Sequence, residues 1–303
     1  MEKTYKYDDE FKRWARALQF AYREDVLKDF NEEKAPQVLL SDENAKQGLI
    51  FYEGFRGLIL EKVGHVSNKM TNNMLRSEHI PYNMFTPLEK FPELAKDVFS
   101  AMIGVPIKQI EMPILIEFAG NGKKSEYLND GTSFDAFVRY SAYDGKRGAI
   151  GIEVKYTENE YPLGVKEGKD IEGIVDDENV RKTNELYRRM TAESGYFVDN
   201  LDIRMFLKAH HLRQIWRNHI LGYSMKNKGE YELIHHVHLY PKNNAHFQKH
   251  ALPDYRKILT EVGLESFKAV TYEGYIALLE KYSDDEKARD WVKYLRARYL
   301  GIK

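Results

Sequence analysis

The chain has 303 residues, 43% of them hydrophobic and 13% aromatic, enough to bury the core of one large or two small domains. No segment approaches the ~18 apolar residues of a membrane span, and the first residues lack the apolar stretch of a secretory signal. Cysteine is absent, which excludes disulfides, iron–sulfur clusters, cysteine-bound zinc and thiol nucleophiles. We therefore expect a soluble, cytoplasmic protein. A net charge of −1 supplies no overall field for a polyanion.

The first third of the chain has helical patterns. Apolar residues recur at helical spacing over 11–22, behind the N-cap signal Asp8-Asp9. A second pattern begins at Ser41-Asp42 and continues towards residue 63. Further helices are predicted over about 67–77 and from Pro87 towards residue 102.

The sequence pattern in the middle of the chain predicts β-strands. Residues 113–119 form a short apolar run, 132–141 alternate and carry aromatics, and 148–156 are again apolar. Asp144-Gly145 is a hairpin signal between the last two, so a three-strand meander is predicted. A fourth strand is predicted over 231–240.

Helical patterns return around these strands, over 180–191, over 203–223 and, behind the capping sequence Ser283–Glu286, towards residue 299. The order predicts an α/β or α+β fold, in which a mixed central sheet is flanked by helices. We treat residues 1–303 as one domain. Its expected parts are a mainly helical N-terminal part (1–110), a core with the chemistry (111–245) and a helical C-terminal part (246–303).

The most informative residues are charges inside apolar strands. Glu153 and Lys155 are two apart, so they project from the same face of a strand, and a hairpin would set Asp135 beside them. Buried charges are costly unless they are paired or bind a metal, and two adjacent carboxylates repel each other. A hard divalent cation resolves both costs, and Mg²⁺ takes one or two carboxylates together with water and phosphate oxygens. The alternative is a set of strand-edge ion pairs, which explains the apolar surroundings poorly.

These residues resemble a known family. Asp135 followed by Glu153-Val154-Lys155 is similar to the D…(D/E)xK signature of the PD-(D/E)XK nuclease superfamily, with Phe134 in place of the usual proline. The blocks Ser77–Asn83, Phe134–Phe137 and Gly151–Tyr156 resemble a bacterial branch of that superfamily, and the likeness covers about residues 77–158.

The resemblance implies a restriction-endonuclease-like core, dependence on Mg²⁺ or Mn²⁺, and hydrolysis of phosphodiester bonds. Asp135 and Glu153 would take the metal-ligand positions and Lys155 that of the catalytic lysine. A third acid often comes from the helix before the meander, where Glu78 lies, and Glu117, inside an apolar strand, competes for this role. Both stay open. Glu158 and Glu160 are expected to be solvated.

The segment 200–257 is locally basic, with ten Lys and Arg against four acids. It is read either as a solvated face or as a phosphate-binding flank. The resemblance places the helix after the meander near the substrate backbone, so Arg213, Gln214 and Arg217 are candidate nucleic-acid contacts. Trp216 is expected in the core. The histidines of this segment are expected to pack or to contact phosphate rather than to bind a metal.

The leading interpretation is a metal-dependent DNA endonuclease of restriction, repair or defence type. DNA is favoured over RNA as the partner, a homodimer is left open, and no membrane partner is expected. One alternative is a catalytically silent nucleic-acid-binding or assembly module on the same fold, because fold does not determine function. Another is a small-molecule phosphohydrolase, which would need a closed pocket.

Overall fold

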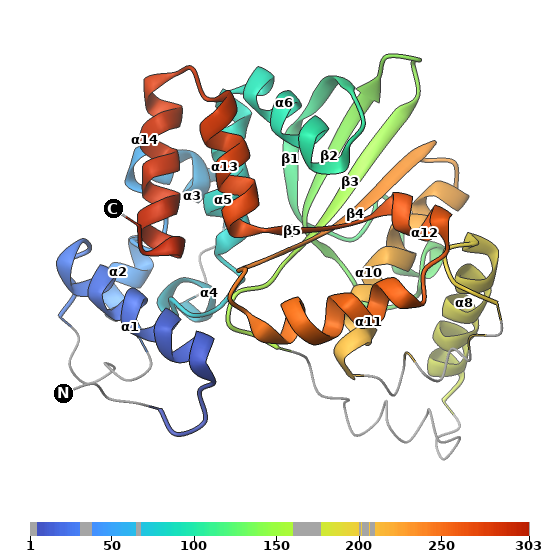
Figure 1. Ribbon diagram of the computed structural model, residues 1–303, viewed down its shortest axis with the longest axis horizontal. Coiled ribbons are helices and arrows are strands. Elements are labelled where there is room, and N and C mark those ends of the chain that lie inside the picture. The colour runs from blue at the N-terminus through green and yellow to red at the C-terminus, as the bar shows by residue number, and fades with distance from the viewer. Residues whose placement is uncertain are drawn as a thin grey trace.

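The computed structural model describes residues 5–30, 38–64, 68–159, 177–199, 201, 206 and 210–302. A five-stranded sheet crosses the molecule in the order β1-β2-β3-β4-β5, with helices on both faces (Figure 1). The strands are β1 (Ile107–Phe118), β2 (Phe134–Ala142), β3 (Arg147–Val154), β4 (Leu233–Tyr240) and β5 (Phe267–Thr271). The first three form an antiparallel meander, and β4 and β5 continue it in parallel. The sheet is therefore mixed, as predicted.

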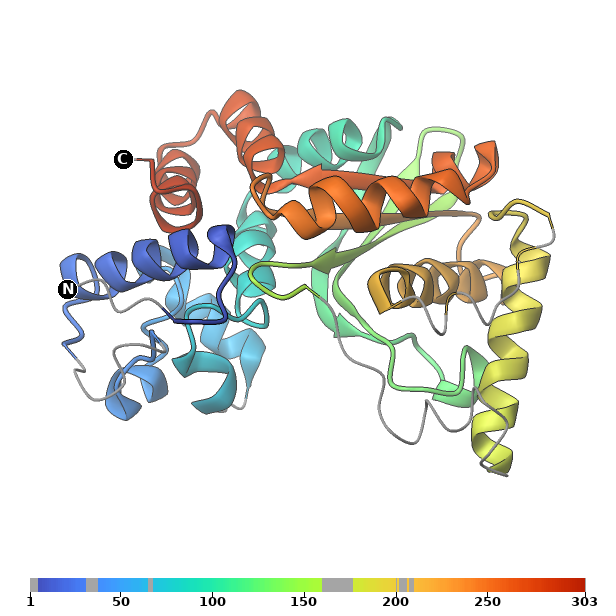
Figure 2. The ribbon, with the colours of Figure 1, turned by 60° about the horizontal axis from the view of Figure 1, so that its bottom comes forward.

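The N-terminal part is helical. Its α-helices are α1 (Glu10–Asp25), α2 (Asp42–Lys46), α3 (Arg56–Val63), α4 (Asn68–Asn72), α5 (Ile80–Phe85) and α6 (Pro92–Ile103). Two 3-10 turns join them, η2 (Glu53–Phe55) and η3 (Thr86–Lys90). The predicted N-cap of α1 is Asp9, whose carboxylate accepts a hydrogen bond from the backbone N–H of Lys12. This cap sets the start of α1 beside the carboxyl end of β3 (Figure 2).

The remaining helices follow the meander. They are α8 (Glu178–Ser194), α10 (His210–Asn227), α11 (Leu252–Lys257), α12 (Glu261–Ser266), α13 (Tyr272–Tyr282) and α14 (Glu286–Leu295). Short turns complete the set: η4 (Lys124–Glu126) and the π-helical η5 (His246–Ala251) and η6 (Arg296–Leu300). No helix among the described residues is long and apolar enough to cross a bilayer.

Each face of the sheet has its own hydrophobic core. On one face Ile152 and Val154 of β3 pack with residues of α5, α6, α13 and α14. On the other, Phe137 of β2 and Ile234 of β4 pack with residues of α8, α10 and α11. Because successive strand residues alternate between faces, Glu153 lies on the α10 face while its neighbours Ile152 and Val154 fill the opposite core.

The fold class is confirmed, but the predicted helix towards residue 63 is wrong. It breaks into α2, η2 and α3, because the chain turns at Gly48 with φ +69°, a conformation that side chains with a Cβ rarely adopt. The predicted helix over 67–77 is also shorter: α4 ends at Asn72, and residues 65–67 lie outside the described part of the chain. Of the predicted 203–223 helix, residues 203–205 and 207–209 are likewise outside it.

Two further differences concern strands. β1 begins at Ile107 rather than at residue 113, and its register against β2 shifts between Glu111 and Leu115, where Pro113 has no N–H for the ladder. The C-terminal part, expected to be helical, also contributes β5. That strand is short and its residues are only partly buried after Phe267, so it lacks the alternating or apolar pattern that reveals strands.

Candidate active site

The hairpin brings together the charges of β2 and β3. Ala136 pairs with Ile152, so Asp135 and Glu153 are the next residues along this register. The Asp135 Oδ2 accepts a hydrogen bond from the backbone N–H of Val154 at 2.6 Å. The Lys155 Nζ lies 2.7 Å from the Glu153 Oε1, and both side chains are almost fully buried. Strand parity and the hairpin thus place a buried ion pair beside a second carboxylate.

Helix α10 supplies two amides to the same carboxylate. Gln214 Nε2 donates to Glu153 Oε1, and Asn218 Nδ2 donates to Glu153 Oε2. Residues four apart lie on one face of a helix, so Gln214 and Asn218 reach Glu153 together. With Lys155 on Oε1, both oxygens of Glu153 have donors, which compensates the cost of burying its charge.

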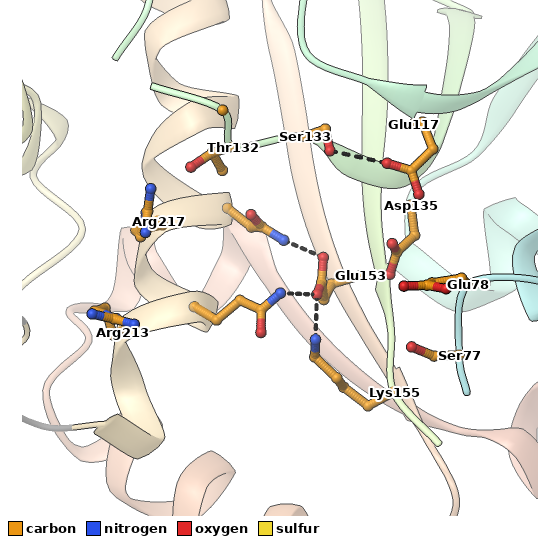
Figure 3. A pocket seen from close by; sticks show the side chains of 13 residues that line it. Ser77, Glu78, Glu117, Thr132, Ser133, Asp135, Glu153, Lys155, Arg213 and Arg217 are labelled. Carbon is orange, nitrogen blue, oxygen red and sulfur yellow. Dashed lines mark hydrogen bonds and ion pairs between the residues drawn. The ribbon is translucent and has the colours of Figure 1, made fainter. Parts of the chain in front are cut away.

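These residues line a pocket of about 340 Å³. Four carboxylates line it, those of Glu78, Glu117, Asp135 and Glu153. Its cations are Lys155 from β3 and Arg213 and Arg217 from α10. Figure 3 shows the acids Glu78, Glu117 and Asp135 on one side of Glu153 and the two arginines on the other. The pocket therefore has an acidic side on the sheet and a basic side on α10.

The crowding of carboxylates shifts their titration. Burial raises the pKa of Asp135 well above its usual range, and the charge of Glu153 raises it further. Burial also raises the pKa of Glu117, and Glu153 and Glu78 add to the effect. Lys155 opposes both shifts. Asp135 and Glu117 therefore keep a proton to higher pH than exposed carboxyl groups do, and a bound cation would favour their ionised forms.

The two candidates for a third acid both line the pocket but come from different elements. Glu117 is the last residue but one of β1 and has φ +55°, an uncommon conformation for a residue with a Cβ. Its Oε2 accepts a hydrogen bond from Ser133 Oγ at 3.3 Å. Glu78 lies in the turn before α5 and pairs with Arg76 at 2.7 Å. Glu78 was expected at the end of a helix before Pro81. That expectation is wrong, because the proline instead occupies the first turn of α5.

The donor set suits a hard cation. The acids around Asp135 and Glu153 offer oxygen ligands, which Mg²⁺ and Mn²⁺ prefer. Within the described ranges no three His, Asp or Glu side chains stand close enough together to hold a metal between them. A cation here would take one or two carboxylates and complete its shell with water or phosphate oxygens, the usual arrangement for Mg²⁺ in proteins. Asp135 and Glu153 fit that role.

The candidate nucleic-acid contacts on α10 have separate environments. Gln214 faces Glu153, as described above. Arg217 Nη2 donates to Asp130 Oδ2 at 2.6 Å, and its Nε donates to the Tyr187 hydroxyl at 3.2 Å. The Tyr187 hydroxyl in turn donates to Asp130 at 2.8 Å. Arg217 therefore ties α10 to α8 and to the loop before β2. Arg213 lines the pocket and is 6% exposed.

The remaining sequence expectations have mixed outcomes. Trp216 is fully buried, as expected. His236 and His238 are buried in β4, where the ring of His236 stacks on Phe267 and that of His238 lies against Phe247. The side chain of His210 and all of Glu160 lie outside the described part of the chain. Glu158 is not simply solvated: its carboxylate accepts from the backbone N–H of Ser77 at 2.6 Å and of Tyr156 at 3.1 Å.

Asn218 and Asp130 were not among the predicted site residues. Asn218 had a usable signal, because it stands four residues after Gln214 on the same helix face. Asp130 had none, since its partner Arg217 is distant in sequence. Phe134, which stands where the family usually has proline, packs against Gly151 and within 5.5 Å of the Phe137 ring. It fills core volume beside the acids.

Comparisons with known proteins agree with this geometry at the level of the family. A family model described as the PD-(D/E)XK nuclease superfamily matches residues 6–301, nearly the whole chain. No curated protein and no solved structure gives a significant match.

Proposed function

Because the chain belongs to the PD-(D/E)XK nuclease superfamily, we propose that it is a metal-dependent endonuclease that hydrolyses phosphodiester bonds of DNA. Asp135 and Glu153 hold Mg²⁺ or Mn²⁺, Lys155 is the catalytic lysine, and Glu78 or Glu117 supplies a further acid. The single observation that carries the proposal is the buried ion pair of Glu153 and Lys155 beside the half-buried Asp135, in a pocket lined by four carboxylates.

The bound cation would polarise a phosphate oxygen and lower the pKa of a coordinated water. The protein's own residues supply the rest. Asp135 and Glu153 provide the negative charge that retains the cation. The ammonium of Lys155 lies 2.7 Å from Glu153. There it would stabilise the negative charge that a phosphate oxygen gains when water attacks. Because the donors on Glu153 are already in place, little reorganisation accompanies the reaction.

Helix α10 gives the proposed substrate a basic wall. Arg213 and Arg217 line the pocket opposite the acids, so a phosphate between the two sides would meet the cation and Lys155 on one side and guanidinium groups on the other. Arginine suits this task because its planar donors match phosphate oxygens. Arg217 would have to share or exchange its contact with Asp130.

The test is nicking of supercoiled plasmid with Mg²⁺, with Mn²⁺ and with EDTA. We expect cleavage by the unmodified protein only with a divalent ion. Lys155→Ala should lower the rate by about 10²–10³ while leaving DNA binding largely intact, since one electrostatic contact is lost from many. Glu153→Gln should also weaken Mn²⁺ binding measured by calorimetry, because it removes a ligand charge.

Matched controls are Lys108→Ala and Glu111→Gln, which change the same residue types at exposed positions of β1. Both should cleave at the normal rate. Equal activity of Lys155→Ala and the unmodified protein would refute the mechanism. A protein that binds DNA and Mn²⁺ but cuts no nucleic acid would instead support the silent binding module.

A further inference from the structure

A second pocket, of about 260 Å³, lies at the carboxyl end of β3. Its lining includes Lys12 and Arg16 from α1 and Arg76 from the segment after α4. Thr157 and Glu158, which follow β3, line it as well. Nothing in the proposed chemistry uses this pocket, yet two cations of α1 line it together with the residues that follow β3. Figure 2 shows α1 beginning beside the carboxyl end of β3.

The two pockets adjoin along two segments of chain. Ser77 and Glu78 line the first pocket, while Arg76 lines the second. Lys155 lines the first, and Thr157, two residues on, lines the second. Two residues of extended chain cover roughly 7 Å at ~3.3 Å each. A strand rises ~3.4 Å per nucleotide along the helix axis, and its phosphates also wind around that axis, so this distance spans at most about two nucleotides.

The charge of the second pocket differs from that of the first. Its lining carries three cations and one carboxylate, whereas the first pocket has three cations and four carboxylates. The carboxylate is Glu158, whose oxygens already accept hydrogen bonds from the backbone N–H groups of Ser77 and Tyr156. Its negative charge is therefore partly compensated, and it acts as a brace between the two segments that separate the pockets.

The cations are held in place to different degrees. Arg16 donates to Asp8 through Nε at 2.6 Å and Nη2 at 3.1 Å, and its guanidinium lies 4.9 Å from the Tyr5 ring centroid. Lys12 is looser: its Nζ is 3.9 Å from Asp8, beyond hydrogen-bond distance, and its side chain is 37% exposed. An anion entering the pocket would thus meet a guanidinium hydrogen-bonded to Asp8 and an ammonium that lies farther from the same carboxylate.

We propose that this pocket is a second phosphate subsite, which binds the nucleic-acid backbone one or two nucleotides from the bond that is cut. The inference rests on the proposed nuclease function and adds where the substrate strand runs: from the acidic pocket, past Arg76, to Lys12 and Arg16. The second pocket would add backbone contacts to those proposed for Arg213 and Arg217 in the first.

The test compares Lys12→Ala with Arg13→Ala, which removes the same charge from an exposed, neighbouring position of α1 outside the pocket. Binding of a labelled duplex is measured by fluorescence anisotropy in Ca²⁺, across about 50–200 mM salt. Loss of one phosphate contact reduces the slope of log Kd against log salt by about 0.9. The Kd of Lys12→Ala divided by the Kd of the unmodified protein should therefore fall about 3- to 4-fold as salt rises over this range. Arg13→Ala should change the slope by less than half as much.

Arg76 is tested separately, because it also pairs with Glu78 of the first pocket. Arg76→Ala should weaken duplex binding as Lys12→Ala does, with Mn²⁺ affinity measured without nucleic acid unchanged. Mn²⁺ affinity that falls in Arg76→Ala, together with an unchanged salt slope, would assign Arg76 to support of Glu78 and overturn its place in the subsite.

Free phosphate and the nucleic-acid backbone share the same chemistry, so inorganic phosphate is titrated alone. We expect it to bind weakly and the duplex to depend on Lys12. Tight, Lys12-dependent phosphate binding with unchanged duplex binding would make this a site for free phosphate and overturn the proposal. Equal salt slopes for Lys12→Ala and Arg13→Ala on a protein that binds DNA would overturn the subsite alone. An unmodified protein that binds no nucleic acid would overturn the proposed function and the subsite with it.

Discussion

Buried histidines should make the folded chain acid-labile. His236 of β4 is 2% exposed, its ring stacks on Phe267 at 5.6 Å, and burial lowers its pKa to about 3. Burial likewise lowers the pKa values of His219 and His238 well below their usual range, and neighbouring His236 adds to both shifts. His236 is therefore neutral in the folded protein at pH 5, and burial disfavours the protonated form of His219 and His238 in the same direction.

The sign and size of the effect follow from linkage. Histidine in the unfolded chain titrates near 6.5, so the unfolded state binds more protons below that pH, and the free energy of unfolding falls as pH drops from about 6.5 towards 3. At about 1.4 kcal/mol per pH unit, His236 alone costs about 2 kcal/mol at pH 5 relative to neutral pH. Against the 5–15 kcal/mol stability of a typical domain, a loss of about 2 kcal/mol is large. His219 and His238 shift in the same direction and add to it.

The assay is urea unfolding followed by tryptophan fluorescence at about pH 7.5 and about pH 5. His236→Phe keeps a ring in the stack and should lose about 2 kcal/mol less than the unmodified protein between the two pH values. His236→Gln serves if the larger ring fits poorly. The control is His250→Gln, at an exposed position. A pH-dependent loss of stability that is equal in His236→Phe, His236→Gln and the unmodified protein would refute the reasoning.

Two further predictions concern α10. Asn218→Ala should raise the Mn²⁺ concentration needed for cleavage by about 10–100-fold, because Asn218 orients the Glu153 carboxylate; Asn227→Ala on the same helix is the control, and an unchanged Mn²⁺ dependence of Asn218→Ala would show that the contact has no positioning role. Asp130→Asn should tighten DNA binding and steepen its salt slope by up to about one unit, since Arg217 would be released towards phosphate. An unchanged slope would leave Arg217 as a structural anchor.

The core of the fold could be predicted from local pattern. The alternation of 132–141, the apolar run of 148–156 and the turn at Asp144-Gly145 correspond to β2, β3 and the hairpin between them. Gly145 adopts φ +86°, as such a turn requires. The positions at which helices are interrupted were harder to predict from the sequence. The helical periodicity over 42–63 continues through Gly48, so only the positive φ of that residue shows where the chain turns.

The candidate site likewise has features that local sequence pattern predicts and features that depend on tertiary packing. Parity along one strand is a local property, so the spacing of Glu153 and Lys155 is enough to place both side chains on one face. The hairpin between β2 and β3 places the side chain of Asp135 on the same face. The donors on Glu153 and the partner of Arg217 depend on how α10 packs across the sheet, and no short-range pattern encodes that packing.

By itself, the sequence determined the sheet's central meander, the face on which Asp135, Glu153 and Lys155 meet, and a resemblance to a nuclease superfamily. These rest on periodicities of a few residues, which side-chain sterics and hairpin geometry enforce locally. Tertiary structure alone decided that Gln214 and Asn218 donate hydrogen bonds to Glu153 and that Arg217 donates one to Asp130. It also decided that α1 brings Lys12 and Arg16 beside the end of β3. Those contacts join residues from about 60 to more than 140 positions apart, and they form only because two separate cores fix helices against opposite faces of one sheet.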